Sequence, residues 1–488
     1  MESGSPGSVL ERALAETQRV FSEVDKVPGR LHGLNPVWAV FDRVHLEVSL
    51  PLALRRRGGE PSGPETLPPR PSRAWAFLRG LAVHTPLFVL SLANLLRLRR
   101  ESRPRVAIWT GDFYDPRNGG DFRLGGLYAH LNAENAAFVD LVRTHNGGLR
   151  QALANARSRG RPVIYYESLA FFLSGAWRAR RPDFSAVPAD HAAVLGRYAP
   201  EIAAVVPHAR LFAALLGFLN VRSLVAWEFS SRQAALIFAA KTRGIPVIGF
   251  MHGAGMRSYM AHEFLPAAAG PLGPDVFGVW SSWWRAYFRR HTSLYGAVEV
   301  SGPMRRPEIA AGAPERATPA RGPRVLWISE PLLDPDEAVP WLRHLCARFE
   351  VTIKKRPFTT DVFYKGLVAR YPEFAALPTA DGNIFQAIAA ADVVIGSHST
   401  AVIDASLAGV PFILVATQKW GDYFELESFD APWAVYVRDV AGLDDSLAAL
   451  AEGAETAETL RALRERFYGS GESDGSLWVA RKALDGLR

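Results

Sequence analysis

Residues 394–415 have the sequence VIGSHSTAVIDASLAGVPFILV and combine two kinds of backbone pattern in one short stretch. An apolar run opens the stretch and another closes it, and each has the length of a buried strand. Between them lie a turn rich in Ser and Thr and a run of small residues that favours a helix. A strand, a helix and a second strand in this order predict two parallel strands joined by a crossover helix.

The same alternation recurs on both sides of this stretch. An earlier series of strands is expected at 105–111, 161–168, 221–229 and 245–253, with a helix at 231–244. A later series is expected at 275–282, 297–303, 324–331, 349–357, 392–399, 410–416 and 433–437. Strands that alternate with helices predict parallel sheets covered by helices on both faces.

Chain length and the Pro- and Gly-rich segments predict how the two series of strands divide into domains. A chain of 488 residues is longer than most single domains. The predicted divisions are a helical extension at 1–103 with a Pro- and Gly-rich linker at 58–72, an N-terminal Rossmann-like domain at 104–270, a C-terminal Rossmann-like domain at 271–470 and a closing helix at 471–488. An Ala-, Pro- and Gly-rich hinge is expected at 305–323. The predicted fold class is therefore α/β, with two doubly wound domains facing a cleft.

The composition is that of an ordinary globular protein, with 48% hydrophobic and 22% charged residues. Because Cys346 is the single cysteine, no internal disulfide and no Cys-based zinc site can form, which favours a reducing compartment. The first residues lack the basic and then apolar layout of a secretory signal. We therefore expect a cytoplasmic location.

Positive charge is concentrated in one part of the chain. Between Leu50 and Arg103 there are ten Arg and three Glu, and this excess equals the net charge of +7 for the whole chain. The apolar run Leu81–Leu96 in the same part is shorter than the roughly 20 residues that span a bilayer. Segment 74–100 therefore predicts either a helix lying on an anionic membrane surface or a core helix with a solvated basic end. Nucleic-acid binding is not expected, because no nucleic-acid motif accompanies the arginines.

The turn within the opening stretch contains His398, Ser399 and Thr400 just before a helix. Backbone N–H groups at a helix start are unpaired and carry the positive end of the helix dipole. The turn is therefore expected to bind an anion, with a phosphate or diphosphate as the best candidate. The alternative is that Ser399 or Thr400 serves only as the N-cap of the helix.

Two further groups of polar residues follow predicted strands in the same half of the chain. The sequence TIKKRP ends a strand with Lys354, Lys355 and Arg356, whose charges could neutralise a diphosphate without a metal. The sequence WISEP ends another strand with Ser329 and Glu330, which are suited to contact a ribose or a phosphate.

These motifs together resemble the donor-binding half of class B glycosyltransferases. The resemblance rests on the order of the SGP turn at 301–303, the strand-end Ser329, the basic KKRP at 354–357, and GSHST before ASLAGVP. The pattern is similar to bacterial surface-polysaccharide enzymes of the polysialyltransferase-like, Kdo-transferase-like and CDP-glycerol-transferase-like groups. It covers about residues 105–470 and implies nucleotide binding by the basic and the Ser/Thr motifs. The family's His-Pro is Arg356-Pro357 here, so a fixed cation stands in place of an imidazole.

The N-terminal half offers candidate catalytic groups. His252 and Gly253 follow a strand and match the His-Gly of the same family, where an imidazole can donate to a leaving phosphate or orient an acceptor hydroxyl. Glu167 and Glu228 end two strands that we expect to be neighbours, and a sugar transferase needs one carboxylate as general base or nucleophile. Glu228 is the first choice and Glu167 the second. Either carboxylate could instead stabilise the start of the helix that follows it.

No metal or other cofactor is expected. Asp334 and Asp336 have a spacing used for metals in another glycosyltransferase class, but they lie at a predicted helix start, where acidic residues are favoured. The sequence lacks the HExxH, GxSxG and GxxxxGK[ST] motifs, which argues against zinc hydrolases, serine esterases and P-loop enzymes.

The sequence therefore predicts a glycosyltransferase that moves a sugar from a CMP-, UDP- or CDP-linked donor to a saccharide or lipid-linked acceptor. We expect it to act in surface or capsular polysaccharide synthesis at the cytoplasmic face of the membrane. One alternative is a non-hydrolysing nucleotide-sugar epimerase, which would turn over the donor without an acceptor. Another is a catalytically silent scaffold on the membrane surface.

Overall fold

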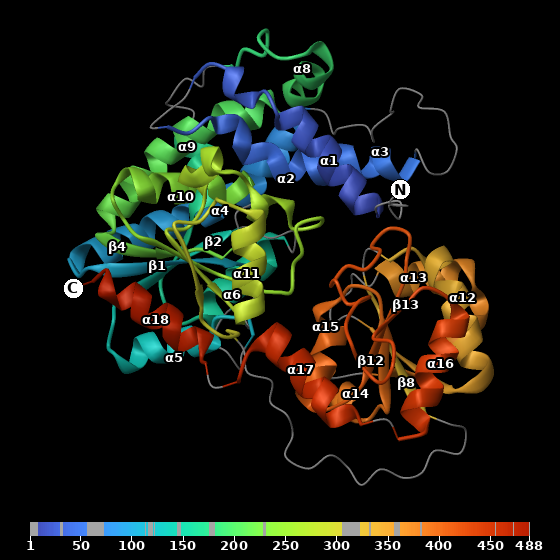
Figure 1. Cartoon of the computed structure of the whole chain (residues 1–488). Helices are drawn as coiled ribbons and strands as arrows, with labels where there is room; N and C mark the ends of the chain where they lie inside the picture. The colour runs from blue at the N-terminus through green and yellow to red at the C-terminus, as the bar shows by residue number, and fades with distance from the viewer. Residues whose placement is uncertain are drawn as a thin grey trace. The chain divides into compact units, whose positions relative to one another are not determined.

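The computed structural model describes residues 8–487 apart from 30–32, 56–72, 113, 116–120, 122, 144–147, 175–180, 228–230, 305–322, 331–332, 356–361, 381–382, 454 and 472. The predicted linker at 58–72, almost all of the hinge at 305–323, Glu228 and Arg356 lie outside the described residues. The chain forms two compact units (Figure 1). Unit 1 comprises Met1–Arg12, Gly253–Met256 and Arg306–Ser470, and unit 2 comprises Ala13–His252, Arg257–Arg305 and Gly471–Arg488.

Unit 2 is built on a seven-stranded parallel sheet in the order β3-β2-β1-β4-β5-β6-β7. Its strands are β1 (Arg105–Gly111), β2 (Phe138–Arg143), β3 (Val163–Tyr165), β4 (Val221–Val225), β5 (Val247–Phe250), β6 (Val276–Val279) and β7 (Ala297–Val300). The chain builds the sheet outward from β1 to one edge and then outward from β4 to the other. The boundary between β1 and β4 is therefore the topological switch point, where open sheets of this kind bind ligands.

Helices cover both faces of this sheet. Figure 1 shows α5 and α18 on one side of it and α9 and α10 on the other. The helices of unit 2 are α2 (Phe41–Val44), α3 (Leu50–Arg55), α4 (Arg73–Arg100), α5 (Gly125–Ala133), α6 (Leu149–Ser158), α7 (Tyr166–Leu173), α8 (Ala189–Gly196), α9 (Ala199–Phe218), α10 (Ser231–Thr242), α11 (Ser282–His291) and α18 (Gly475–Asp485), and α1 (Val9–Phe21) continues into it from unit 1.

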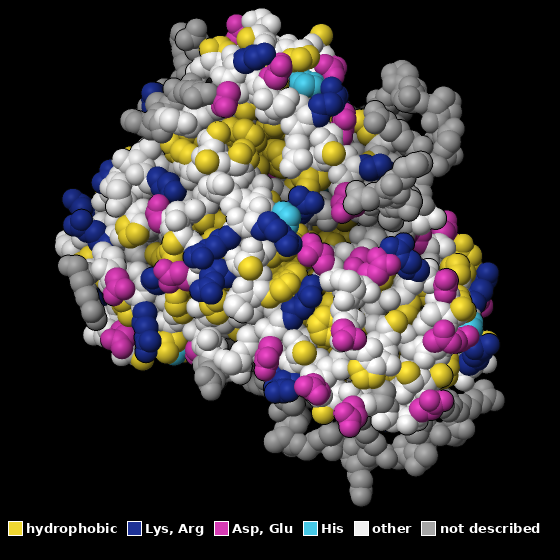
Figure 2. Space-filling model, viewed as in Figure 1, with side chains coloured by type: hydrophobic (Ala, Val, Ile, Leu, Met, Phe, Trp, Pro, Cys, Tyr) yellow, Lys and Arg dark blue, Asp and Glu magenta, His cyan; other side chains and the backbone are white. Residues whose placement is uncertain are grey.

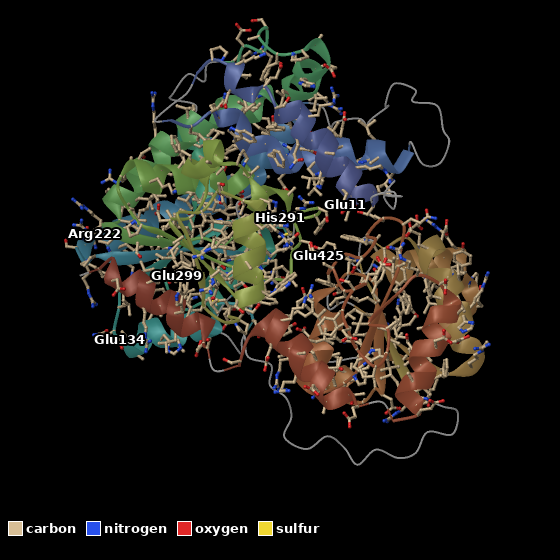
Figure 3. All side chains as sticks on the ribbon, viewed as in Figure 1. Glu11, Glu134, Arg222, His291, Glu299 and Glu425 are labelled. Atoms are coloured by element: carbon tan, nitrogen blue, oxygen red, sulfur yellow. The ribbon has the colours of Figure 1, made fainter. Side chains whose placement is uncertain are left out.

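The closing helix α18 packs on unit 2 although it follows unit 1 in the sequence. Glu299 of β7, labelled in Figure 3, accepts hydrogen bonds from Trp478 Nε1 at 3.2 Å and Lys482 Nζ at 2.9 Å. Gly278 lies so close to Trp478 that a Cβ at this position would approach the ring to 2.7 Å. The helix predicted at 471–488 therefore exists and completes the first sheet's helical layer.

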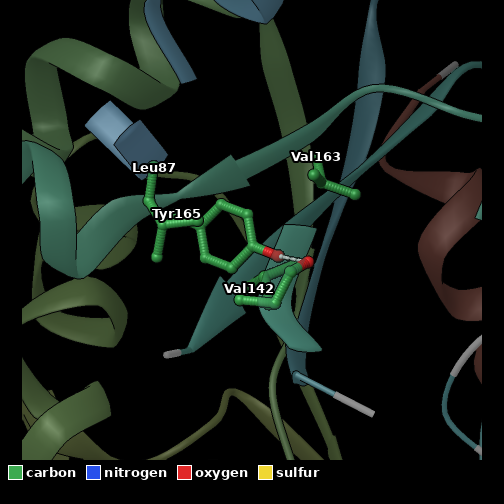
Figure 4. Close-up of a cluster of buried hydrophobic side chains, with 5 residues drawn as sticks. Leu87, Val142, Val163 and Tyr165 are labelled. Carbon is green, nitrogen blue, oxygen red and sulfur yellow. Dashed lines mark hydrogen bonds between the residues drawn. The ribbon is translucent and has the colours of Figure 1, made fainter. Parts of the chain in front are cut away.

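From Ala13 onward the helical N-terminal extension belongs to unit 2, and α4 is part of its core. Leu87 of α4 is fully buried in a cluster with Val142, Ala152, Val163 and Tyr165 (Figure 4). These residues come from α4, β2, α6 and β3, so burial of apolar surface joins the extension to the edge of the sheet.

Unit 1 is built on a six-stranded parallel sheet in the order β10-β9-β8-β11-β12-β13. Its strands are β8 (Arg324–Ile328), β9 (Glu350–Lys354), β10 (Thr379–Ala380), β11 (Val393–Gly396), β12 (Phe412–Val415) and β13 (Tyr436–Val437). Its helices are α12 (Pro335–Arg348), α13 (Val362–Arg370), α14 (Ile384–Ala389), α15 (Thr400–Ile403), α16 (Val440–Ala451) and α17 (Thr456–Tyr468). The switch point of this sheet lies between β8 and β11.

The predicted pair of doubly wound sheets is confirmed, but the predicted division between them at 270/271 is wrong. Strand β6 pairs with β5, and β7 pairs with β6, so the segments at 275–282 and 297–303 belong to the first sheet. The compact units divide after Arg305. An apolar strand pattern shows that a segment joins some sheet, and it carries no information about which of two sheets.

Candidate functional site

Predicted site residues cluster at the switch point of each sheet. In unit 1, Glu330 follows β8, Lys355 follows β9, and the turn at 397–399 follows β11. These three strands are adjacent and parallel, so their carboxyl ends meet at one edge of the sheet. The structure therefore brings together three segments that are up to about 70 residues apart in the sequence.

The carboxylate of Glu330 occupies the turn that follows β11. It accepts hydrogen bonds from the backbone N–H groups of Ser397, His398 and Ser399, at 3.2, 2.9 and 2.7 Å. It also accepts from the Ser397 hydroxyl, and His398 Nδ1 lies 3.0 Å from it. The turn does bind an anion, but that anion belongs to the same chain. The prediction that these N–H groups are unpaired and open to a phosphate is wrong.

The position of Glu330 also corrects its predicted contact with a ribose or phosphate, because its side chain has no exposed surface. Burial raises the pKa of Glu330, but the charge of His398 and the hydrogen bonds from the turn outweigh burial, so the pKa lies below its usual value. The carboxylate is therefore ionised near neutral pH and holds the turn in one conformation.

His398 is fixed on two sides. Its ring stacks on the indole of Trp420 with the centroids 3.4 Å apart and the planes 9° apart. Tyr423 packs edge-on against the same indole, with a centroid separation of 5.3 Å. With Glu330 beside Nδ1 and Trp420 against its face, the imidazole is held in one orientation at the carboxyl edge of the sheet.

Ser399 is the N-cap of α15, and its hydroxyl accepts from Ala401 N–H at 3.3 Å. Ser399 therefore does cap the helix. Thr400 Oγ1 accepts from the backbone N–H of Ala254 at 3.0 Å, within unit 1. The Ser/Thr turn therefore holds both Glu330 and the segment Gly253–Met256.

The basic cluster at the end of β9 divides into two roles. Lys354 is buried and donates to the carbonyl oxygen of Ala380 at 3.1 Å, so it ties β9 to β10. Lys355 is only half-buried, and its Nζ lies 5.0 Å from the ring centroid of Tyr364. Lys355 is the lysine that can approach a ligand.

Ser329, which follows β8, is only 2% exposed. It is therefore better placed to support the edge of the sheet than to contact a nucleotide.

In unit 2, three side chains meet at the switch point between β1 and β4. The Arg123 guanidinium lies 4.4 Å from the ring centroid of Trp227, which follows β4. The ring of His252, which follows β5, lies 4.9 Å from that of Trp227. A cation, an indole and an imidazole therefore form one cluster at this edge of the sheet.

Two nitrogen atoms of this cluster are buried without a hydrogen-bond partner among the described residues. They are His252 Nδ1 and Trp227 Nε1. Burial, reinforced by the charge of Arg123 and by His262, lowers the pKa of His252 to about 3, so the imidazole is neutral at physiological pH. Buried polar groups are nearly always paired in native proteins, so these two atoms are available to a ligand that reaches the switch point.

The two candidate carboxylates are not on neighbouring strands. Glu167 lies in the first turn of α7, directly after β3 at the edge of the sheet. Strands β2 and β1 separate β3 from β4, which at a spacing of about 4.8 Å per strand removes Glu167 by roughly 14 Å from the end of β4. Glu228 follows β4 in the sequence but lies outside the described residues.

The acidic pair at the start of α12 has the structural role expected from its position. Asp334 caps the helix by accepting from Asp336 N–H, and both carboxylates pair with Arg370, at 3.1 and 2.9 Å. In the described part of the chain, no group of three or more His, Cys, Asp or Glu side chains is arranged to hold a metal ion.

The sequence analysis missed Arg123, Trp227, Trp420 and Tyr423. Trp227 stands directly before Glu228 in the sequence, so the strand-end position could have identified it. Trp420 and Tyr423 have no comparable signal, because they reach His398 from the segment that follows β12.

No protein-family model and no curated protein sequence matches the chain. Solved structures with a similar arrangement include a UDP-glucosyltransferase from Polygonum tinctorium, with 14% identity, coverage of 79% of this chain and 99% of that chain, and a TM-score of 0.46. A UDP-GlcNAc 2-epimerase from Neisseria meningitidis has 10% identity, coverage of 78% and 100%, and a TM-score of 0.46. A sucrose-phosphate synthase from Thermosynechococcus elongatus has 14% identity, coverage of 78% and 98%, and a TM-score of 0.46. These likenesses leave the reaction to be argued from the site.

Proposed function

We propose that the protein is a metal-independent glycosyltransferase that moves a sugar from a CMP-, UDP- or CDP-linked donor to a saccharide or lipid-linked acceptor. The observation that carries this proposal is that each of the two Rossmann-like sheets has a polar site at its switch point, and that the two sites differ. One site presents a fixed imidazole and a lysine, and the other has buried polar atoms without partners. The first suits the phosphates of a donor and the second the hydroxyl groups of an acceptor.

In the donor site, the nucleotide phosphate would be held by side chains. His398, Ser399 and Thr400 supply ring N–H and hydroxyl groups, and Lys355 with Arg356 supplies positive charge. Glu330 keeps His398 and the turn in place, and Ser329 supports the same edge. Charge that develops on the leaving phosphate would be stabilised by Lys355 and the His398 ring.

In the acceptor site, a carboxylate would take the proton from the acceptor hydroxyl. The hydroxyl oxygen then forms a bond to the anomeric carbon while the bond from that carbon to the phosphate oxygen breaks. Glu228 is our first candidate for this base, because it follows β4 at the switch point, and Glu167 is the second. His252 is neutral and would orient the acceptor hydroxyl through its unpaired Nδ1.

The proposed setting is surface or capsular polysaccharide synthesis, with the protein in the cytoplasm and peripheral to the membrane. The resemblance of the strand-end motifs to surface-polysaccharide enzymes supports this setting. The basic character of segment 74–100 supports the membrane location.

The test is a thermal-shift screen of the full chain with CMP, CDP, UDP and GDP, each with and without magnesium. One nucleotide should raise the midpoint without magnesium, and the double variant Ser399→Ala/Thr400→Ala should lose that shift. Asp439→Ala removes another N-cap of unit 1 and should keep it. If no nucleotide shifts the wild-type protein, the proposal fails and a scaffold becomes the better account. Consumption of a nucleotide-sugar without any acceptor would instead favour an epimerase.

A further inference from the structure

The large hydrophobic side chains that remain exposed are gathered on and beside α4. Five of the nine such residues found in the described part of the chain lie on this helix, namely Phe77, Leu78, Val89, Leu92 and Leu96. Leu173 of α7, which packs against α4, and Phe218 of α9, which Arg99 covers at 5.4 Å, extend the same surface. We call these seven residues the α4 patch. Exposed apolar side chains gathered along one element indicate an interaction surface.

The residues of the patch follow the period of one helix face. Leu78, Val89, Leu92 and Leu96 recur at intervals of 11, 3 and 4 positions, which places them along one side of α4. The opposite side carries Leu87, which is fully buried in the cluster of Figure 4. The helix is therefore apolar on both sides, but unit 2 covers only one of them.

Polar contacts also fix the inner side of α4 to the sheet edge. Ser91 Oγ accepts from the backbone N–H of Tyr165 at 2.9 Å, and Asn94 Nδ2 donates to the carbonyl oxygen of Val163 at 2.9 Å. These contacts complete backbone hydrogen bonding along β3, which is an edge strand. The outer face is thus presented by a helix that is firmly attached to unit 2.

This attachment distinguishes a helix that lies on a membrane from one that crosses it. Gly80–Arg100 and Ala199–Phe218 are both long and apolar enough to span a bilayer. A spanning α4 would have to leave β3 and give up the buried Leu87 and the Ser91 and Asn94 hydrogen bonds. With α4 parallel to the surface, the exposed side chains enter lipid and the inner contacts stay intact.

The charges around the patch favour an anionic surface. Arg97, Arg99 and Arg100 form the last turn of α4, next to Leu96. Residues 306–470 of unit 1 contain 16 Lys or Arg and 23 Asp or Glu, a net charge of −7, whereas the whole chain has +7. The rest of the chain, which includes α4, therefore carries +14, and part of this charge lies beside α11, at the edge of the sheet away from α4 (Figure 2). Positive charge next to an apolar face is the combination that binds anionic lipid.

We propose that the α4 patch docks unit 2 onto an anionic membrane surface, with Leu92 and Leu96 inserted among the lipids and Arg97, Arg99 and Arg100 facing the phosphate headgroups. The docking surface lies on the edge of the first sheet and uses none of the residues assigned to the donor or acceptor. It rests on and deepens the proposed membrane location, and it is independent of the proposed reaction.

The test is sedimentation of the full-length protein with vesicles, one set of phosphatidylcholine alone and one of equal parts phosphatidylcholine and phosphatidylglycerol. The wild-type protein should bind the anionic vesicles and lose binding at high salt. Leu92→Ser/Leu96→Ser should weaken binding by about a hundredfold, since each buried leucine contributes roughly a factor of ten. Arg97→Gln/Arg99→Gln/Arg100→Gln should also weaken it by on the order of a hundredfold, at about fivefold per arginine.

Val362→Ser is the matched control, because Val362 of α13 is 64% exposed and Leu96 is 63% exposed, but Val362 lies in unit 1. This variant should bind vesicles like the wild type. All variants should keep the wild-type thermal midpoint and any nucleotide-induced shift, which separates failure of docking from failure of the proposed reaction. Absence of wild-type binding to anionic vesicles would overturn the proposal. So would self-association in solution that the Leu92→Ser/Leu96→Ser variant abolishes, because a second copy would then cover the patch.

Discussion

The turn that follows β11 in unit 1 and the Trp227–His252 cluster of unit 2 lie at equivalent positions in the two sheets but differ in their hydrogen bonding. At β8/β11 in unit 1, the Glu330 carboxylate, three backbone N–H groups, a hydroxyl and an imidazole satisfy one another. At β1/β4 in unit 2, His252 Nδ1 and Trp227 Nε1 are buried, and neither has a partner among the described residues.

This difference shows two ways in which the carboxyl edge of a sheet can be arranged before a ligand binds. A turn that is already filled by its own carboxylate is rigid, so it offers side chains in fixed positions at little cost in entropy when a ligand binds. A cluster with unpaired buried groups is under-satisfied until a ligand supplies the missing hydrogen bonds.

The largest effect is expected from removing the carboxylate that fills the unit 1 turn. Glu330→Ala leaves three backbone N–H groups and His398 without their anion, so we expect a loss of about 3–5 kcal/mol of unfolding free energy. Glu330→Gln keeps one acceptor oxygen and should lose less. The measurement is urea unfolding, with hydrogen exchange of 394–403 as the local readout. Asp392→Ala breaks a partly exposed pair with Arg324 and should cost about 1 kcal/mol or less. Equal losses for Asp392 and Glu330 would contradict the comparison.

The same carboxylate gives the unit 1 turn a defined pH dependence. The pKa of Glu330 is lowered from a usual value of 4.5, so the folded state favours the ionised form. Its contribution to stability is complete above pH 4.5 and is lost as the pH falls through the folded pKa. Glu330→Gln should therefore remove part of the acid sensitivity below pH 4.5.

A smaller effect of acid is expected at the switch point of unit 2. The pKa of His252 is lowered from 6.5 to about 3. Between these values the unfolded chain binds a proton that the folded chain does not, so stability falls as the pH is lowered below 6.5. At pH 5 the loss from this residue should be about 2 kcal/mol. His252→Gln should flatten the stability curve between pH 6.5 and 5. Identical pH profiles for wild type and His252→Gln would show that the imidazole is not buried as described.

The sequence predicted strands best where no charged residue interrupts the middle of the strand. β1 was predicted with its observed bounds, because RVAIWTG is an uninterrupted run suited to a strand buried on both faces. β2 was missed, because FVDLVR contains Asp140 in the middle of the run. Asp140 has no exposed surface and accepts from Arg159 Nη1 at 2.8 Å and from Tyr128. A buried charge is tolerated only with such partners, and the partners cannot be identified from the strand itself.

The sequence predicted where the residues of the candidate site lie, but not which of them form hydrogen bonds with one another. The Ser/Thr turn, the basic strand end and WISEP were correctly placed at the carboxyl ends of adjacent strands. That Glu330 would fill the turn was missed, because the two segments are 67 residues apart and any anion could have satisfied the same N–H groups. Likewise, Glu167 and Glu228 follow consecutive strands of the predicted series, but strand order in the sheet separates them.

The smallest stability change is expected at Ser399, and it tests most directly whether Glu330 fills the turn or leaves room for another anion. Ser399→Ala removes the N-cap of α15 and should cost about 1 kcal/mol in urea unfolding. Aspartate is normally as good an N-cap as serine. Here Ser399 N–H already donates to Glu330 at 2.7 Å, so an aspartate that accepted from Ala401 N–H would place a second carboxylate beside the buried carboxylate of Glu330. Ser399→Asp should therefore be less stable than the wild type at pH 7 and recover as the pH is lowered and the new carboxylate is protonated. Wild-type stability for Ser399→Asp at pH 7 would mean that the turn still has room for an anion, and the contrast between the two switch points would be lost.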